Sequence, residues 1–204
     1  MPKVKIKKKS TFIDMTAMSD VTVLLLTFFM LTSTFIQKEP VMVSTPSSVS
    51  DIKIPETDIL QILVDPDGKI FMSLDRQEDR VAVLQEVGER YGVKFTPEQI
   101  HTFKLANSFG APIRKMGQFL DLSPDQRDRI LKTLGIPCDS TDNEFKVWVE
   151  TARRQVGREL RIAIKADQNT SYAHIKNLMS SLQDIRENRY NLITSLKVVP
   201  QSEN

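Results

Sequence analysis

A single long apolar run, residues 18–36, constrains this chain more than any other feature. As a helix its nineteen residues would cover about 28 Å, enough to cross the apolar core of a bilayer. Five lysines, at positions 3, 5, 7, 8 and 9, precede the run, and Lys38 is the first basic residue after it. This asymmetry predicts a cytoplasmic basic tail over residues 1–14, a transmembrane helix over residues 15–37, and an extracytoplasmic remainder.

A cleaved secretion signal is the main alternative for this segment, because signals also combine basic residues with an apolar run. Signal cores usually span about 7–15 residues and end at a small-x-small cleavage site. This run is longer, contains Asp20, and continues into Phe35, Ile36 and Gln37. We therefore expect an uncleaved anchor.

Asp20 is an acidic residue inside the apolar run, and its position there requires an explanation. An ionised carboxylate at the centre of a membrane helix costs about 2.5–3.5 kcal/mol. At 100° per residue, Thr16, Thr27 and Thr34 fall within about 40° of Asp20, so the polar groups share one face. Such a helix is suited to facing a partner or a narrow wet path. The alternative is that Asp20 caps the amino terminus of the helix.

Residues 13–30 resemble the amino-terminal signature of the ExbD/TolR family, in which a polar residue, a threonine and a proline precede an intramembrane aspartate and a leucine-rich helix. Thr16 matches the threonine and Asp20 matches the aspartate. In that family the aspartate takes up and releases the proton that drives an inner-membrane motor. This chain departs from the signature at Asp14, where asparagine is usual, and at Ala17, where proline is usual.

The resemblance implies a location and a set of partners. It implies a bacterial inner-membrane protein with one span, a cytoplasmic amino terminus and a periplasmic domain. It also implies a homodimer of this chain inside a pentamer of an ExbB- or TolQ-like multispan protein, and a TonB-like periplasm-spanning partner. The proton-coupled subunit of a TonB-type transport system is our first interpretation. A TolR-like role in envelope integrity and a non-motor, membrane-anchored structural domain are the alternatives.

Beyond the membrane segment, the pattern predicts a linker and then a small α+β domain. Residues 38–57 contain three prolines and a Ser/Thr cluster without a sustained apolar period, which indicates a flexible periplasmic linker. Its brief apolar alternations would form only isolated or edge strands. The periplasmic domain, residues 58–204, should open with a hairpin of residues 59–64 and 69–72, in which Gly68 supplies the positive φ of the turn.

Four helices are expected next, and residues 79–142 form a helical insertion relative to the resembled family. The first runs from Arg80 to a stop at Gly92, and the next two start at the Thr-Pro and Ser-Pro pairs of residues 96–97 and 123–124. The third should bury Ile130, Leu131 and Leu134. The fourth begins near Asp142 and carries Phe145, Trp148, Val149, Ala152 and Val156. The insertion is either an elaboration of packing or a docking surface.

The carboxy-terminal part should form a strand, a helix and a strand. Residues 161–167 alternate as a half-buried strand, and residues 192–199 form the last strand. Between them a helix starts near Ser171 and buries Ile175, Leu178, Met179, Leu182 and Ile185. Asp167 and Tyr172 match a turn aspartate and a Pro-Tyr pair in the resembled family, with Ser171 in place of the proline.

Composition argues against several other functions. The net charge of +2 lacks the basic excess of a nucleic-acid-binding face, so we expect no nucleic-acid partner. His101 and His174 have no ligand at metal-binding spacing, and no phosphate loop or nucleophile elbow is present. We therefore expect no enzyme activity, no metal and no cofactor. The lone Cys138 is expected to be an inert buried thiol, with a bridge between two copies as the alternative.

Overall fold

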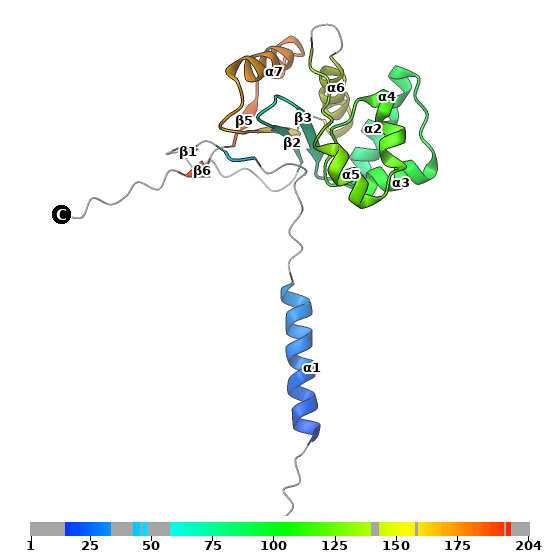
Figure 1. Ribbon diagram of the computed structural model, residues 1–204, viewed down its shortest axis with the longest axis vertical. Helices are drawn as coiled ribbons and strands as arrows, with labels where there is room; N and C mark the ends of the chain where they lie inside the picture. Colours follow the sequence, from blue (N-terminus) through cyan, green and yellow to red (C-terminus); the bar gives the residue numbers. More distant parts are fainter. Residues whose placement is uncertain are drawn as a thin grey trace, which may run out of the picture. The chain divides into compact units, whose positions relative to one another are not determined.

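A computed structural model describes residues 15–33, 43–45, 47–48, 58–139, 143–157, 159–193 and 195–196 (Figure 1). The chain divides into two compact units, residues 1–37 and residues 38–204. The first unit contains one described helix. The second contains the strands and all the other described helices. The mixed α+β class predicted from the sequence is confirmed.

Helix α1, Met15–Thr32, is the described helix that is long and apolar enough to cross a membrane. Its 18 residues correspond to about 27 Å of helix. None of them is buried within its own unit. The predicted span reached residue 37, whereas Ser33 is described and is not helical. Residues 34–37 and the basic tail lie outside the described residues.

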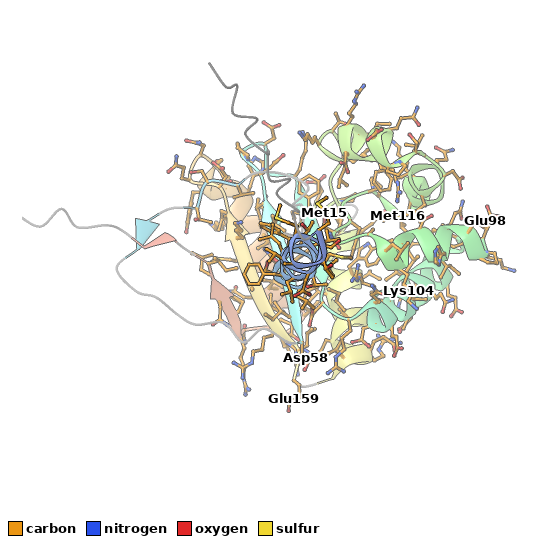
Figure 2. The ribbon with its side chains drawn as sticks, turned by 90° about the horizontal axis from the view of Figure 1, so that it is seen from below. Met15, Asp58, Glu98, Lys104, Met116 and Glu159 are labelled. Atoms are coloured by element: carbon orange, nitrogen blue, oxygen red, sulfur yellow. The ribbon has the colours of Figure 1, made fainter. Side chains whose placement is uncertain are left out.

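The second unit is built on a four-stranded sheet of order β3-β2-β4-β5, comprising β2 (Ile59–Val64), β3 (Ile70–Leu74), β4 (Arg161–Ala166) and β5 (Tyr190–Leu192). Strand β2 runs antiparallel to β3 and parallel to β4, and β4 runs parallel to β5. Figure 2 shows Asp58 and Glu159, which precede β2 and β4, at the same end of the sheet, as parallel pairing requires. The predicted hairpin is confirmed, with Gly68 at φ 81°.

The predicted half-buried alternation of β4 is wrong. Three successive residues, Ile162, Ala163 and Ile164, are all buried. The reason is that β4 lies between β2 and β5 and is covered on both faces, whereas alternation is typical of strands with one face in water. The central position of β4 was not visible in its own sequence.

Helices α2 (Gln77–Tyr91), α3 (Pro97–Leu105), α5 (Pro124–Leu131) and α6 (Glu144–Val156) confirm the four predicted ones. Helix α2 starts three residues earlier than expected and ends as predicted, with Gly92 in the left-handed region at φ 68°. Helix α3 begins with the predicted capping box: the Thr96 hydroxyl accepts from the Gln99 amide, and the Gln99 side chain accepts from the Thr96 amide. Helix α6 starts later than expected, with the Asn143 side chain as its cap.

Helix α4, Ile113–Leu120, was not predicted. Its sequence contains Gly117 and follows Pro112, and both residue types are typical of loops, so the local sequence favours a loop over a helix. Nevertheless four of its residues are buried: Ile113, Met116, Phe119 and Leu120. The prediction that α5 buries Ile130 is wrong, because the helix ends at Leu131 and leaves Ile130 38% exposed, while Leu131 is buried.

Helix α7, Tyr172–Asp184, follows β4 as predicted, with the Ser171 hydroxyl capping its first turn. The last strand differs from the prediction. It starts at Tyr190 rather than Leu192, stops at Leu192, and a separate strand β6, Ser195–Leu196, follows. Strand β6 pairs in parallel with β1, Ser47–Ser48, in a second sheet of two strands. Residues 197–199 lie outside the described part of the chain.

The helices and the sheet share one apolar core. We call residues 77–139, which hold α2 to α5, the helical segment. Phe103 and Phe109 of this segment pack on Trp148 of α6, with the Phe109 and Trp148 ring centroids 4.7 Å apart. Figure 1 shows the helical segment gathered beside β3, with α7 toward β5. Because one core spans both parts, the helical segment is integral to the domain.

Candidate functional site

Asp20 lies in the second turn of α1. The described helix already contains the five residues from Met15 to Ser19 before it. A capping side chain sits at the residue before the helix and bonds the amides of the first turn. Asp20 is too far along the helix for that role, so the capping alternative is wrong. Its carboxylate must be accommodated within the apolar stretch.

The neighbours of Asp20 on the helix are mostly apolar. Residues Val21, Val23 and Leu24 are all more than half exposed on the surface of α1. Among the described residues, none donates a hydrogen bond to the Asp20 carboxylate or forms an ion pair with it.

Three of the four threonines of α1 donate their hydroxyl protons to backbone carbonyls of the same helix. Thr22 donates to the Met18 carbonyl at 2.8 Å, and Thr27 donates to the Leu24 carbonyl at 2.9 Å. Thr32 makes the same kind of bond to Phe28 at 2.8 Å. Each of these hydroxyls can therefore lie in an apolar environment without an unmet donor, and retains lone pairs as acceptors.

The predicted polar face is described at three of its four positions. Thr16 lies one turn before Asp20, at the spacing where helical side chains are neighbours. Thr27 is on the same face but two turns away, about 10 Å along the axis, so it does not contact Asp20 within one helix. Thr34 lies outside the described residues. The helix thus offers Thr16 as a neighbour of the carboxylate and Thr27 as a separate polar position.

A second polar site lies at the end of β4, around Asp167, whose contact with Ser44 the sequence did not predict. The buried carboxylate of Asp167 accepts from the Asn169 amide at 2.9 Å and from the Ser44 amide at 2.8 Å. The Ser44 carbonyl in turn accepts from the Gln168 amide at 2.8 Å. These bonds hold the segment of residues 43–45 against the sheet. The sequence could not predict this contact, because 123 residues separate Ser44 from Asp167.

The electrostatics of Asp167 follow from these contacts. The amide of Asn169, followed by the amide of Ser44, stabilises the ionised carboxylate and lowers the pKa of Asp167 below its usual value. Tyr172, five residues further on, is 77% exposed. Asp167 works as a tie between distant segments.

The remaining candidates have structural surroundings. The His174 ring packs on Gly68, where a Cβ atom would lie 2.5 Å from the ring, and His101 is exposed on α3. The Cys138 sulfur lies 3.4 Å from the Ser181 hydroxyl, and burial raises the pKa of the thiol. Among the described residues, no three His, Cys, Asp or Glu side chains are grouped to hold a metal ion.

A cavity of about 430 Å³ lies between α6 and the end of α7, lined by Glu150, Arg153, Arg154, Ile185 and Glu187. Its charges are already paired. Arg153 makes two bonds to Glu187, at 2.6 and 2.7 Å, and Arg154 pairs with Glu86. Glu150 is 3.4 Å from Arg90. Arg153 and Glu187 pair across the cavity, and Arg154 and Glu150 pair with residues of α2, so these ion pairs join α6 to its neighbours.

Comparison with protein families gives one result that covers nearly the whole chain. The family model described as Biopolymer transport protein ExbD/TolR matches residues 7–197. Comparisons with curated proteins and with solved structures returned no match. The family is one of non-enzymatic proteins of membrane transport and energy transduction. The match includes α1 with Asp20 and every described strand, so the chain belongs to the ExbD/TolR family.

Proposed function

We propose that this chain is the proton-coupled subunit of an inner-membrane motor, ExbD-like, which energises TonB-dependent transport across the outer membrane. The observation that carries the proposal is the position of Asp20. It lies inside the one described helix that is able to span a membrane, and too far from the amino terminus of that helix to cap it. Family membership supports the coarser statement that the chain is an energy-transduction subunit of biopolymer transport.

The coupling step follows from the cost of burying a charge. An ionised carboxylate is unfavourable against apolar walls, by about 2.5–3.5 kcal/mol at a helix centre and by less toward an end, where Asp20 lies, and protonation removes most of this cost. The neutral form is therefore stable where the charged form is not, and each form favours a different orientation of α1. A proton that crosses a potential of 100 mV supplies about 2.3 kcal/mol. This energy is comparable with the difference between the two forms and can bias the orientation.

A single helix cannot enclose a path for protons. All described residues of α1 are exposed, and the Asp20 carboxylate has no partner among the described residues. In the hydrocarbon region such a group requires surrounding protein that supplies polar partners or water. We therefore propose an ExbB- or TolQ-like multispan partner around a pair of these helices, with the second unit in the periplasm and a TonB-like protein beside it.

The decisive variants are Asp20→Asn and Asp20→Glu in the full chain, expressed in its own bacterium. Asp20→Asn keeps the size of the side chain but cannot ionise, so energised uptake should fall to the level of a deletion strain. Asp20→Glu retains an ionisable group and should retain part of the activity. Normal uptake by Asp20→Asn at normal protein levels would refute proton coupling and leave the non-motor structural role.

The same variants distinguish the two members of the family. Failed uptake of siderophores or vitamins with an intact envelope identifies the ExbD-like role. A leaky envelope with normal uptake identifies the TolR-like role. Co-purification with a multispan protein, and with either a TonB-like or a Tol-like protein, provides an independent reading of the same question.

A further inference from the structure

The outer edge of β3 is occupied by the helical segment of the same chain. Strand β3 lies at one end of the sheet order, so its outer backbone groups have no neighbouring strand of the sheet. Met72 and Phe109 fill this position with a pair of backbone hydrogen bonds, the amide of each donating to the carbonyl of the other at 2.8 Å. Phe109 belongs to the connection between α3 and α4.

Two further contacts extend the cover along β3. The Ile136 amide donates to the Ile70 carbonyl at 2.9 Å, and the Ser73 hydroxyl donates to the Asn107 carbonyl at 2.5 Å. Outward-facing backbone groups alternate along an edge strand, so Ile70 and Met72 are successive outward-facing positions of β3. Each of them is engaged by a backbone group of the helical segment.

Two glycines permit this close approach. A Cβ atom at Gly110 would lie 2.2 Å from the Phe71 ring, and one at Gly135 would lie 2.9 Å from the Lys69 side chain. Neither residue has a positive φ, so it is the proximity of β3 that disfavours a side chain there. Gly117, in α4 of the same segment, differs because a Cβ atom would meet Gln99 at an ordinary 3.5 Å.

We propose that the helical segment is a built-in cap on the β3 edge, which prevents a second copy of this chain from adding its own strand there. Exposed edge strands present unpaired amides and carbonyls that template pairing with another chain, and covering the edge with a loop removes the template. The contacts to β3 are irregular loop contacts rather than a full ladder, so they block the edge without continuing the sheet.

The cap makes the sheet asymmetric. Among the described residues, β5 forms the opposite edge and pairs only with β4. Figure 2 shows Glu98, Lys104 and Met116, from α3 and α4, together on one side of the sheet. A strand that a partner adds to this sheet is therefore excluded from the β3 edge. This inference concerns the second unit alone and does not depend on proton coupling by Asp20.

The test uses the full chain in detergent, with Asp75→Cys, at an exposed position directly after β3, as the reporter and Cys138→Ser to remove the native thiol. Gly110→Ala and Gly110→Val should detach the cap, because their side chains collide with Phe71. We expect faster hydrogen exchange at the Met72 amide and a several-fold rise in disulfide-linked dimers under mild oxidation. Gly117→Ala, in the same reporter background, should change neither quantity.

Two results would overturn the proposal. The first is fast exchange of the Met72 amide in the unsubstituted chain, since an occupied edge protects it. This measurement does not require the variants to fold. The second is a Gly110 variant with retained helical circular dichroism and an exposed Met72 amide that forms no more dimer than Gly117→Ala does. An edge that is open and still does not pair has no need of a cap.

Discussion

Two threonines of α1 make similar hydrogen bonds and lie on different faces of the helix. Thr22 and Thr27 both donate to backbone carbonyls. Thr27 lies within about 40° of Asp20 around the helix, whereas Thr22 is about 160° away. Removing either hydroxyl has a similar effect on the helix itself. A difference between the two substitutions therefore reports on the polar face.

We expect Thr27→Val to lower proton-coupled uptake mildly, by less than Asp20→Asn does, and Thr22→Val to leave it unchanged. Uptake rates at matched protein levels provide the measurement. If Thr27→Val were as severe as Asp20→Asn, the path would depend on Thr27 as much as on Asp20, and its placement at Asp20 alone would be wrong. If both threonine variants had equal effects, the polar face would have no functional meaning.

Arg153 joins three parts of the second unit. Its guanidinium binds Glu187 after α7 and the Leu160 carbonyl before β4, the latter at 2.6 Å. We expect Arg153→Ala to lower the free energy of unfolding by about 2 kcal/mol, because it leaves a half-buried carboxylate and a carbonyl without their donor. The exposed neighbour Arg154→Ala should cost less than about 1 kcal/mol. Urea denaturation of both variants tests this, and equal losses would contradict it.

Asp167 predicts a pH dependence for the contact with Ser44. The pKa of Asp167 is lowered in the folded chain, so its contribution is fully present above the unfolded value of about 3.9 and is lost as the pH falls through the folded value. Acid should therefore speed hydrogen exchange at the Ser44 amide relative to β4 amides. Asp167→Asn should show weaker protection of Ser44 at neutral pH, without the acid step. An acid step that persists in Asp167→Asn would assign it to another group.

At the scale of elements, local signals identified those helices whose caps lie in their own sequence. The capping box of Thr96 and Gln99 at the start of α3 and Gly92 at the end of α2 are examples. In both cases the capping residues are close in sequence to the helix that they cap. Helix α4 lacks such a signal. Its first amide, at Ile113, is capped by the buried carboxylate of Glu144 at 2.8 Å, from a residue 31 positions later. A cap supplied from this distance leaves no local mark in the sequence.

Glu144→Ala should therefore destabilise α4 rather than α6. It removes the acceptor of a buried amide, which costs about 1–3 kcal/mol. Loss of the exposed cap in Thr96→Ala should cost about 1 kcal/mol. Hydrogen exchange resolves the two: Glu144→Ala should increase exchange across α4, and Thr96→Ala across α3. Exchange that rises in α6 alone would show that the carboxylate serves its own helix.

At the scale of the whole molecule, the sequence predicted the order of the helices and strands better than the contacts between them. The hairpin, α7 and the apolar span followed from local periodicity and turn residues. The burial of β4 on both faces, the pairing of β1 with β6 and the cover on β3 all depend on contacts between distant residues. The role proposed for Asp20 rests on the family resemblance and on its place in α1, because no contact among the described residues reveals it.

The anchor interpretation gives a prediction for the intact protein. If α1 remains part of the mature chain, the protein isolated from membranes should begin with the basic tail and should resist extraction by alkaline carbonate. Amino-terminal sequencing of that protein checks this directly. A mature chain that starts after the apolar run would remove Asp20 altogether and identify the segment as a secretion signal.

The tie between Ser44 and the end of β4 also determines how tension enters the second unit. Ser44 precedes every strand of the second unit in the chain and is bonded to Asp167 and Gln168, directly after β4. A pulling force on the amino-terminal side of the chain acts first on these bonds. They transmit it to β4, which has a neighbouring strand on each side. In single-molecule stretching, their rupture should appear as a small early extension before the sheet itself yields, at a lower force in Asp167→Asn, which loses the carboxylate acceptor but keeps the bond from the Gln168 amide.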